Sequence, residues 1–133
     1  MTDLAQAIGR VLLSVIFIVA GYNKLVAITG TTAYFTRLGL PVPQVTAWLV
    51  ASFEIAAGLM ILVGFTTRWV ALALCVFTGI ALFLGHKFWA VEAAQYNNQL
   101  NHALKNLAIM GAFLLLYAGG PGRYSVDAKS GSR

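Results

Sequence analysis

Long apolar segments alternate with short polar ones along the whole chain. Four windows carry few or no charged residues: 11–23, 38–67 with one acidic interruption at Glu54, 69–86 and 106–122. A helix needs about 20 predominantly apolar residues to cross a bilayer, and these windows approach that length. The pattern therefore predicts an all-α fold, an integral membrane four-helix bundle.

The first window is short for a membrane helix. Its thirteen residues lie between Arg10 and Lys24 and cover about 20 Å of helix, less than the roughly 30 Å hydrocarbon core. The two cations must therefore either extend to the membrane surface or face a polar interior. We favour anchoring at the surface, because long basic side chains readily place their charge in the headgroup region.

The segment between the first two spans predicts a short interfacial helix. Thr31 and Thr32 can cap its start, an amphipathic run follows, and Gly39 can end it. Pro41 and Pro43 then permit the start of the next membrane helix. We expect a single domain over residues 1–127 and a mobile polar tail over residues 128–133.

Composition supports a membrane location. The chain is 59% hydrophobic and 10% charged, and its mean hydropathy is +0.79, whereas a soluble domain is about one quarter charged. The single cysteine, Cys75, excludes an intrachain disulfide framework and is best explained as a packing residue. The net charge of +5 comes from scattered basic residues, a pattern that favours anionic lipid headgroups over nucleic acid.

The distribution of basic residues predicts the topology. Four spans place both termini on one face of the membrane, and the residues of that face are Arg10, Arg68, Arg123, Lys129 and Arg133. The basic residues of the opposite face are Lys24, Arg37, Lys87 and Lys105. Because cytoplasmic segments carry the excess of Lys and Arg, we expect a multi-pass inner-membrane protein with cytoplasmic termini.

Glu54 is the most distinctive polar residue, because it lies near the middle of the second span. An ionisable group there costs several kcal/mol unless it is paired or protonated. The residues at helical spacing around it, Ala47, Ala51 and Gly58, form a small-residue face that favours close helix contact, so Glu54 should point inward. It is either a neutral hydrogen-bond donor that serves packing, or a proton carrier, ion ligand or headgroup contact.

The first helix presents a second polar face. Its members follow one another at spacings of three and four residues: Arg10, Ser14, Phe17, Gly21 and Lys24. Ser14, and Thr78 on the third helix, fall at a depth similar to that of Glu54, so both hydroxyls are candidate partners of its carboxyl group. The predicted intramembrane polar network therefore consists of Arg10, Ser14, Glu54 and Thr78.

Two histidines lie at the face opposite the termini. His86 ends the third helix and His102 begins the fourth, so the two imidazoles could meet. No third ligand stands at a metal-binding spacing, so we predict no metal site. An imidazole beside interfacial aromatic residues can bond a quinone carbonyl, although a solvated or loop-capping role is the alternative. The candidate ligand-binding residues are Glu54, His86, Trp89, His102, Lys105, Asn106 and Lys24.

Several motifs in this order resemble the DoxX family. They are Arg10 with Gly21 and Lys24, the 38–41 turn, Glu54 with Gly58, Gly64 with Thr67 and Arg68, the 86–89 segment, the 102–111 segment and the C-terminal segment 120–127. The resemblance implies a small inner-membrane protein of four helices, related to the DoxD subunit of thiosulfate:quinone oxidoreductase and to proteins linked with oxidative-stress complexes. The residues that match the family pattern are Arg10, Lys24, Glu54, His86, Lys105, Asn106 and Arg123.

The leading hypothesis for function is a quinone-interacting or redox-associated membrane subunit. Quinone is its candidate cofactor, and no covalently bound cofactor is expected. The expected partners are the lipid bilayer and either a redox enzyme or further copies of the chain. The alternatives are a small-solute or proton-linked transport module and a structural membrane partner. No self-sufficient catalytic motif stands in the sequence, so whether the chain is an enzyme is left open.

Overall fold

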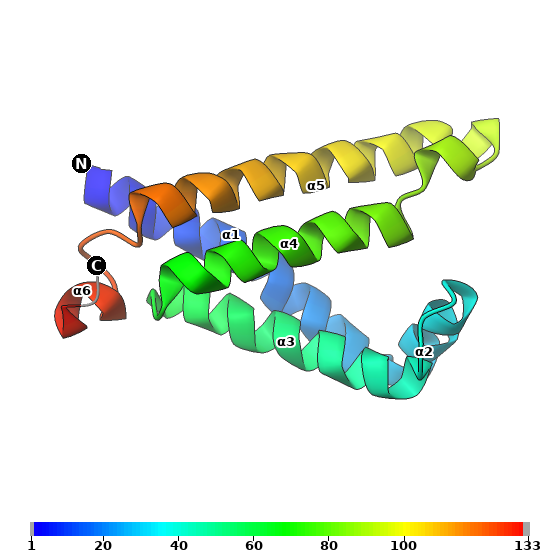
Figure 1. Ribbon diagram of the computed structural model, residues 1–133, viewed down its shortest axis with the longest axis horizontal. Helices are drawn as coiled ribbons and strands as arrows, with labels where there is room; N and C mark the ends of the chain where they lie inside the picture. The colour runs from blue at the N-terminus through cyan, green and yellow to red at the C-terminus, as the bar shows by residue number, and fades with distance from the viewer. Residues whose placement is uncertain (1, 132–133) are drawn as a thin grey trace. The chain divides into compact units, whose positions relative to one another are not determined.

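The computed structural model describes residues 2–131, which are almost entirely helical (Figure 1). The elements in chain order are α1 (Thr2–Val26), α2 (Ile28–Arg37), α3 (Pro43–Val63), α4 (Thr67–Gly85), the 3₁₀ helix η1 (Phe88–Ala90), α5 (Ala93–Gly119) and α6 (Val126–Ser130). Within residues 2–131, four helical segments are long and apolar enough to cross a membrane, namely Thr2–Val26, Pro43–Val63, Thr67–Ala90 and Ala93–Gly119. The all-α prediction with four spans is confirmed, and the described residues contain no strand.

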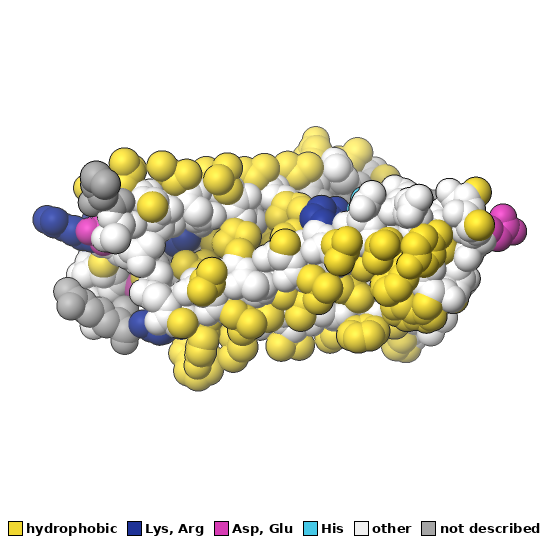
Figure 2. Space-filling view, turned by 90° about the horizontal axis from the view of Figure 1, so that it is seen from above, with side chains coloured by type: hydrophobic (Ala, Val, Ile, Leu, Met, Phe, Trp, Pro, Cys, Tyr) yellow, Lys and Arg dark blue, Asp and Glu magenta, His cyan; other side chains and the backbone are white. Residues whose placement is uncertain are grey.

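The chain divides into two compact units. The first consists of Met1–Thr67 with Pro121–Arg133 and holds α1, α2, α3 and α6. The second, Arg68–Gly120, holds α4 beyond its first residue, η1 and α5. Hydrophobic side chains cover much of the surface seen in Figure 2, and the acidic ones stand at its ends, as expected for a chain surrounded by lipid.

In the first unit, α1 and α3 run antiparallel in close contact. A Cβ atom on Gly21 would lie 2.7 Å from the Ala51 carbonyl oxygen, and one on Gly58 would lie 2.8 Å from Ile18 Cγ1. Glycine at both positions therefore permits the backbones to approach, which supplies dispersion contacts where the hydrophobic effect is absent. The buried residues of α1 are Arg10, Ser14, Phe17 and Gly21, four of the five residues of the predicted polar face.

The short helix α2 follows α1 after one residue, packs against α3 and buries Phe35. It begins earlier than predicted. Its N-cap is Ala27, and no side chain caps its first turn. The predicted Thr31 cap is wrong: Thr31 lies inside the helix, and its hydroxyl donates to the Lys24 carbonyl oxygen at 3.3 Å. The predicted stop is confirmed at Gly39, which has the left-handed φ of 74° that glycine accommodates most readily.

In the second unit, α4 and α5 run antiparallel (Figure 1), and side-chain contacts join them at both ends and near the middle. Arg68, at the start of α4, donates through Nη1 to the Tyr117 and Ala118 carbonyl oxygens at 2.5 and 3.0 Å. These carbonyls belong to the last turn of α5, where no intrahelical donor is available and the helix dipole favours a cation. Near the middle, Cys75 Sγ lies 3.7 Å from the Met110 carbonyl oxygen, which agrees with a packing role for this cysteine.

The chain ends in a folded segment of the first unit. Ser125 caps α6 by accepting a hydrogen bond from the Ala128 amide at 3.1 Å. The helix extends to Ser130 and so includes part of the predicted tail, whose residues 132–133 lie outside the described residues. The mobility of the tail stays a prediction.

Candidate functional site

Glu54 forms an ion pair with Lys24 inside the first unit. Lys24 Nζ lies 2.7 Å from Glu54 Oε2 and 3.0 Å from Oε1. Glu54 is the twelfth residue of the 21-residue helix α3, which is its middle, whereas Lys24 stands in the last turn of α1. Helical side chains lean toward the N-terminus of their helix, so the lysine chain extends back along α1 to reach the carboxylate.

Glu54 is nearly closed to its surroundings, whereas Lys24 is partly exposed. The side chain of Glu54 is 6% exposed and that of Lys24 is 27% exposed. The prediction that Glu54 points inward is confirmed, but the predicted hydroxyl partners are wrong. Ser14 donates instead to the Val11 carbonyl oxygen of its own helix, and Thr78 donates to that of Leu74, each at 2.7 Å.

Arg10 lies in a separate cluster at the other end of the α1–α3 contact. It is 3% exposed, and its Nη1 donates to the Ile61 and Leu62 carbonyl oxygens at 3.3 and 3.2 Å. Its Nη2 donates to the Tyr124 carbonyl oxygen. The guanidinium therefore caps the end of α3 and holds the C-terminal segment, rather than joining Glu54 in one network as predicted. Surface anchoring, the favoured interpretation, is likewise wrong for Arg10.

Asp127 completes this cluster and was missed as a site residue at the sequence level. Its carboxylate is 6% exposed and accepts from the Thr66 amide at 2.7 Å and the Thr67 amide at 2.8 Å. These amides open α4, where the helix dipole favours an anion. Its own amide donates to the Gly64 carbonyl oxygen at 2.9 Å. The available signal was a Ser-x-Asp cap that follows a Gly-Pro-Gly turn after two intervening residues.

The second unit brings the two histidines together, which confirms that prediction. The imidazoles of His86 and His102 are stacked, with ring centroids 4.9 Å apart and an angle of 12° between the planes. His86 Nδ1 lies 3.0 Å from Gln99 Oε1. His102 Nδ1 lies 3.2 Å from Lys105 Nζ. Gln99 was missed at the sequence level, although it stands three residues before His102 and so shares its helix face.

The neighbours of the two rings fix where their protons lie. A lysine ammonium can only donate, so His102 Nδ1 accepts and the ring proton is on Nε2. Gln99 Oε1 can only accept, so His86 Nδ1 carries a proton. The pair therefore combines an oriented donor on His102 with a second imidazole held in place by an amide. Such a pair can bond a polar ligand and exchange a proton with it.

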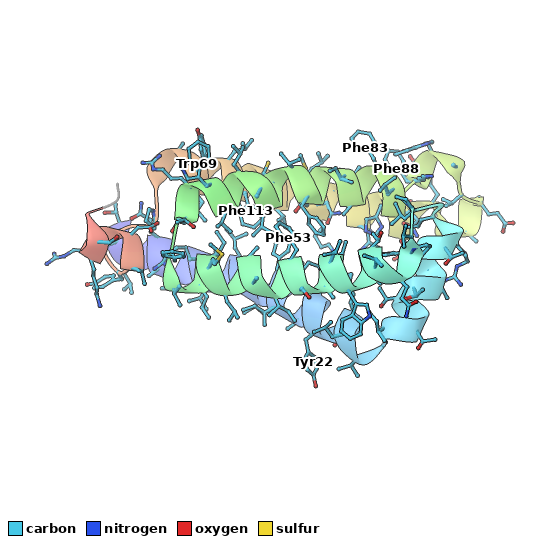
Figure 3. The ribbon with its side chains drawn as sticks, turned by 60° about the horizontal axis from the view of Figure 1, so that its bottom comes forward. Tyr22, Phe53, Trp69, Phe83, Phe88 and Phe113 are labelled. Carbon is cyan, nitrogen blue, oxygen red and sulfur yellow. The ribbon has the colours of Figure 1, made fainter. Side chains whose placement is uncertain are left out.

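An aromatic cluster stands beside these histidines at the same end of α4. Trp89, which is 54% exposed, meets Phe88 edge to face with centroids 5.0 Å apart. Phe83 lies 6.3 Å from Trp89, and Tyr96 lies 6.1 Å from Phe88. Figure 3 shows Phe83 and Phe88 together at this end and Trp69 at the opposite end of α4. Exposed rings of this kind mark the membrane interface.

The remaining candidate of this region is Asn106. It is 8% exposed and stands four residues after His102 on the same face of α5. Within the described residues, no group of three or more His, Cys, Asp or Glu side chains could hold a metal ion. The second unit thus assembles the predicted histidine, lysine and aromatic residues at one end, and the first unit holds the Lys24–Glu54 pair.

Four membrane-crossing helices with a buried ion pair and a stacked histidine pair define a small multi-pass membrane protein. The chain belongs to the DoxX family, whose pattern matches residues 5–87. It is 39% identical over 127 residues to inner membrane protein YqjF of Escherichia coli K12, covering 96% of this chain and 92% of that protein. It is 34% identical over 122 residues to inner membrane protein YphA of the same strain, covering 92% and 87%.

A eukaryotic relative matches over a smaller share of its length. The Surfeit locus protein 4 homolog of Schizosaccharomyces pombe is 32% identical over 126 residues, which are 93% of this chain but 37% of the yeast protein. No solved structure matches the chain. The family resemblance is confirmed, and the chain is a DoxX-family inner membrane protein.

Proposed function

We propose that this DoxX-family protein binds the headgroup of a membrane quinone and serves as a redox-associated membrane subunit. The observation that carries the proposal is the stacked pair of His86 and His102, with centroids 4.9 Å apart, at the aromatic end of the second unit. Quinones dissolve in the bilayer and place their polar ring near its interface, so a polar pair next to interfacial aromatics suits them.

The histidines offer the chemistry that a quinone headgroup needs. His102 presents Nε2–H as a donor, because Lys105 occupies its Nδ1. A quinone carbonyl oxygen is an acceptor and would take this hydrogen bond. The exposed ring of Trp89 offers a flat surface on which the quinone ring can stack. In this role the protein positions the quinone, and electron transfer belongs to a partner enzyme in the same membrane.

The role assigned to Gln99 and Lys105 is orientation. Each bonds one Nδ1 atom and so decides which ring nitrogen is left for a ligand. Loss of either residue should weaken binding less than loss of the imidazoles themselves. Lys24 and Glu54 belong to the other unit, and the proposal does not depend on them.

The test is quinone binding by the purified protein in phospholipid nanodiscs, with decylubiquinone as the probe. Quenching of tryptophan fluorescence reports binding, and empty nanodiscs give the partitioning background. Replacing both imidazoles, in His86→Ala/His102→Ala, should weaken the dissociation constant by about tenfold or more, which is 1.4 kcal/mol. Binding as tight as that of the wild type in this folded double variant would overturn the proposal.

Two matched pairs sharpen the result. Gln99→Ala should weaken binding, and Gln95→Ala, an exposed glutamine four residues earlier on α5, should leave it unchanged. Trp89→Phe should reduce the quenching, and Trp69→Phe at the opposite end of α4 should not (Figure 3). Equal effects within each pair would show that the probe partitions into the protein without using this site.

A further inference from the structure

We propose that the Lys24–Glu54 pair is a second binding site, which takes a small organic anion such as a carboxylate together with one proton. The site lies wholly in the first unit and does not involve the histidines. Its chemistry is an exchange of partners: the anion replaces Glu54 on the lysine ammonium, and the released Glu54 carboxylate takes up a proton.

The geometry makes Lys24 the point of entry. The ammonium group has three N–H bonds, and the 2.7 and 3.0 Å contacts to the Glu54 carboxylate account for two of them. The Lys24 side chain is 27% exposed and that of Glu54 is 6% exposed. A ligand that reaches the pair therefore meets the cation first, and the cation selects a ligand with a negative charge or a strong acceptor.

Charge balance then requires the proton. The pair is neutral as it stands, with one cation and one carboxylate. Adding an anion alone would leave one excess negative charge in the middle of a membrane helix, at a cost of several kcal/mol. A proton taken from the aqueous phase onto a Glu54 carboxyl oxygen restores neutrality, because protonated Glu54 and a Lys24–anion pair carry no net charge together.

Four other charged groups of the first unit, Arg10, Arg37, Asp3 and Asp127, make their contacts away from the pair. Arg10 is bound to backbone carbonyls at the far end of the α1–α3 contact. Arg37 of α2 lies over the ring of Tyr34, 5.9 Å from its centroid. The two other buried or bonded carboxylates of this unit, Asp3 and Asp127, accept from backbone amides. Among the described residues of the unit, Glu54 pairs with Lys24 alone, so the pair itself sets the local charge.

The helix contact keeps the pair in register. Gly21 lies one turn before Lys24, and its backbone approaches Ala51 so closely that a Cβ atom would lie 2.7 Å from the Ala51 carbonyl oxygen. This contact prevents α1 from sliding along α3, so the ammonium stays within reach of the carboxylate. The exchange then needs rotation of side chains only, which takes place without separation of the helices.

The experiment measures protons and ligand together on the full chain in phosphatidylcholine nanodiscs. Decanoate is the probe, decanol controls for partitioning of the alkyl chain, and calorimetry in buffers of different ionisation enthalpy counts the protons. We expect uptake of about one proton per decanoate, with the affinity falling about tenfold for each unit rise in pH. Decanoate binding at the protein without proton uptake would overturn the proposal.

Three variants separate this exchange from simple charge attraction. Glu54→Gln leaves Lys24 without a carboxylate competitor, so decanoate should bind at least about tenfold more tightly at neutral pH, without proton uptake and without pH dependence. Lys24→Met should abolish the binding, and Lys87→Met, which removes an exposed lysine of the second unit, should leave it unchanged.

The two charge variants also cover a failure to fold. If Lys24→Met does not give a helical protein, Glu54→Gln still decides the question, because it keeps the size of the side chain. Binding to Glu54→Gln that remains coupled to a proton, or that stays as weak as in the wild type, would contradict the proposal. Neither outcome bears on quinone binding at the histidines, so the two proposals can fail separately.

Discussion

At the residue scale, the polar groups inside the membrane spans are nearly all satisfied within the chain. Lys24 neutralises Glu54, the hydroxyls of Ser14 and Thr78 bond to their own helices, and Arg10 bonds to three carbonyl oxygens. Among the described residues, the buried side-chain polar atoms without a partner are Arg10 Nε and Thr67 Oγ1. Lipid offers no replacement for a lost partner, so each pairing contributes to stability.

The Lys24–Glu54 pair should therefore show strong energetic coupling. Glu54→Leu leaves the ammonium group unpaired and should lower the free energy of unfolding by about 3 kcal/mol, as for other buried ion pairs. Lys24→Met/Glu54→Leu removes both charges and should recover at least about 1 kcal/mol of that loss. The measurement is unfolding in detergent micelles for the wild type, both single variants and the double variant. Additive effects in this cycle would show that the two side chains do not interact.

The sequence could place Glu54 but could not name its partner. Helical periodicity alone shows that the carboxyl shares a face with the small residues around it, because that depends on one helix. The partner depends on which helix packs against α3 and at what register. Lysine has a long flexible chain, so Lys24 reaches a carboxylate that lies well beyond its own backbone position. The residues expected at the same depth in the membrane as Glu54 are Ser14 and Thr78, which were therefore the predicted partners. Their short side chains bond instead to carbonyl oxygens of their own helices.

At the element scale, hydropathy located the four spans but misjudged the ends of the helices. α1 covers 25 residues, whereas the uncharged window covers thirteen, because Arg10 lies inside the helix with its charge satisfied. A hydropathy window treats a charged residue as an interruption, because it contains no information about the group that pairs with that residue. The histidine pair was predictable from the chain order alone, since consecutive antiparallel helices bring the end of α4 beside the start of α5.

The contact between α1 and α3 depends on the absence of side-chain atoms at Gly21. A Cβ atom there would lie 2.7 Å from the Ala51 carbonyl oxygen and 2.7 Å from Ile55 Cγ1, so Gly21→Ala should destabilise the protein by about 1 to 3 kcal/mol. Gly9 on the same helix has nothing within 4 Å of its Cβ position. Gly9→Ala should therefore be neutral or stabilising by up to about 1 kcal/mol through helix propensity.

Thermal unfolding of both variants in the same detergent tests this difference. Matched gains at Gly21 and Gly9 would mean that helix propensity alone governs both positions. Equal stability of all three proteins would mean that the two helices do not make this contact in the membrane-extracted protein.

At the scale of the whole chain, the C-terminal segment joins parts of the sequence that are far apart. The Arg123 amide donates to Asp3 Oδ1 at 3.1 Å across 120 residues, and Arg10 binds the Tyr124 carbonyl oxygen across 114 residues. Asp127 fixes the turn between α3 and α4, where Thr66 holds a left-handed φ of 45°. That conformation is rare for a β-branched residue, and the Asp127 carboxylate stabilises it by accepting from the Thr66 amide.

Removal of this carboxylate should have a larger effect than removal of the Asp3 carboxylate, which bonds a single amide. Asp127→Ala leaves two amides without their acceptor and should cost about 2 to 3 kcal/mol. Asp3→Ala removes one exposed contact to the Arg123 amide and should cost about 0.5 kcal/mol or less. Unfolding in detergent and protease cleavage after residue 120 report the two effects. Similar stabilities for the two variants would show that the segment does not hold the turn.

The last prediction concerns the orientation of the chain in the membrane. The bond between the Arg123 amide and Asp3 places both ends of the chain together, in agreement with an even number of spans. Arg10 and Lys24 are bonded inside the chain, so they do not count among the basic residues that differ between the two membrane faces. The basic residues left on the face of the termini are Arg68, Arg123, Lys129 and Arg133, and those left on the other face are Arg37, Lys87 and Lys105.

This bias of one charge predicts cytoplasmic termini, with residues 97–101 on the opposite side. A fluorescent protein fused after Arg133 should be bright, and alkaline phosphatase inserted at residues 97–101 should be active. Because the bias is small, Asn97→Lys/Asn98→Lys should remove or reverse it and give a mixed population, whereas Asn97→Gln/Asn98→Gln should not. A dark C-terminal fusion with an active phosphatase at the same position in the wild type would refute this orientation. An unchanged orientation in the lysine variant would mean that features other than these basic residues decide the insertion.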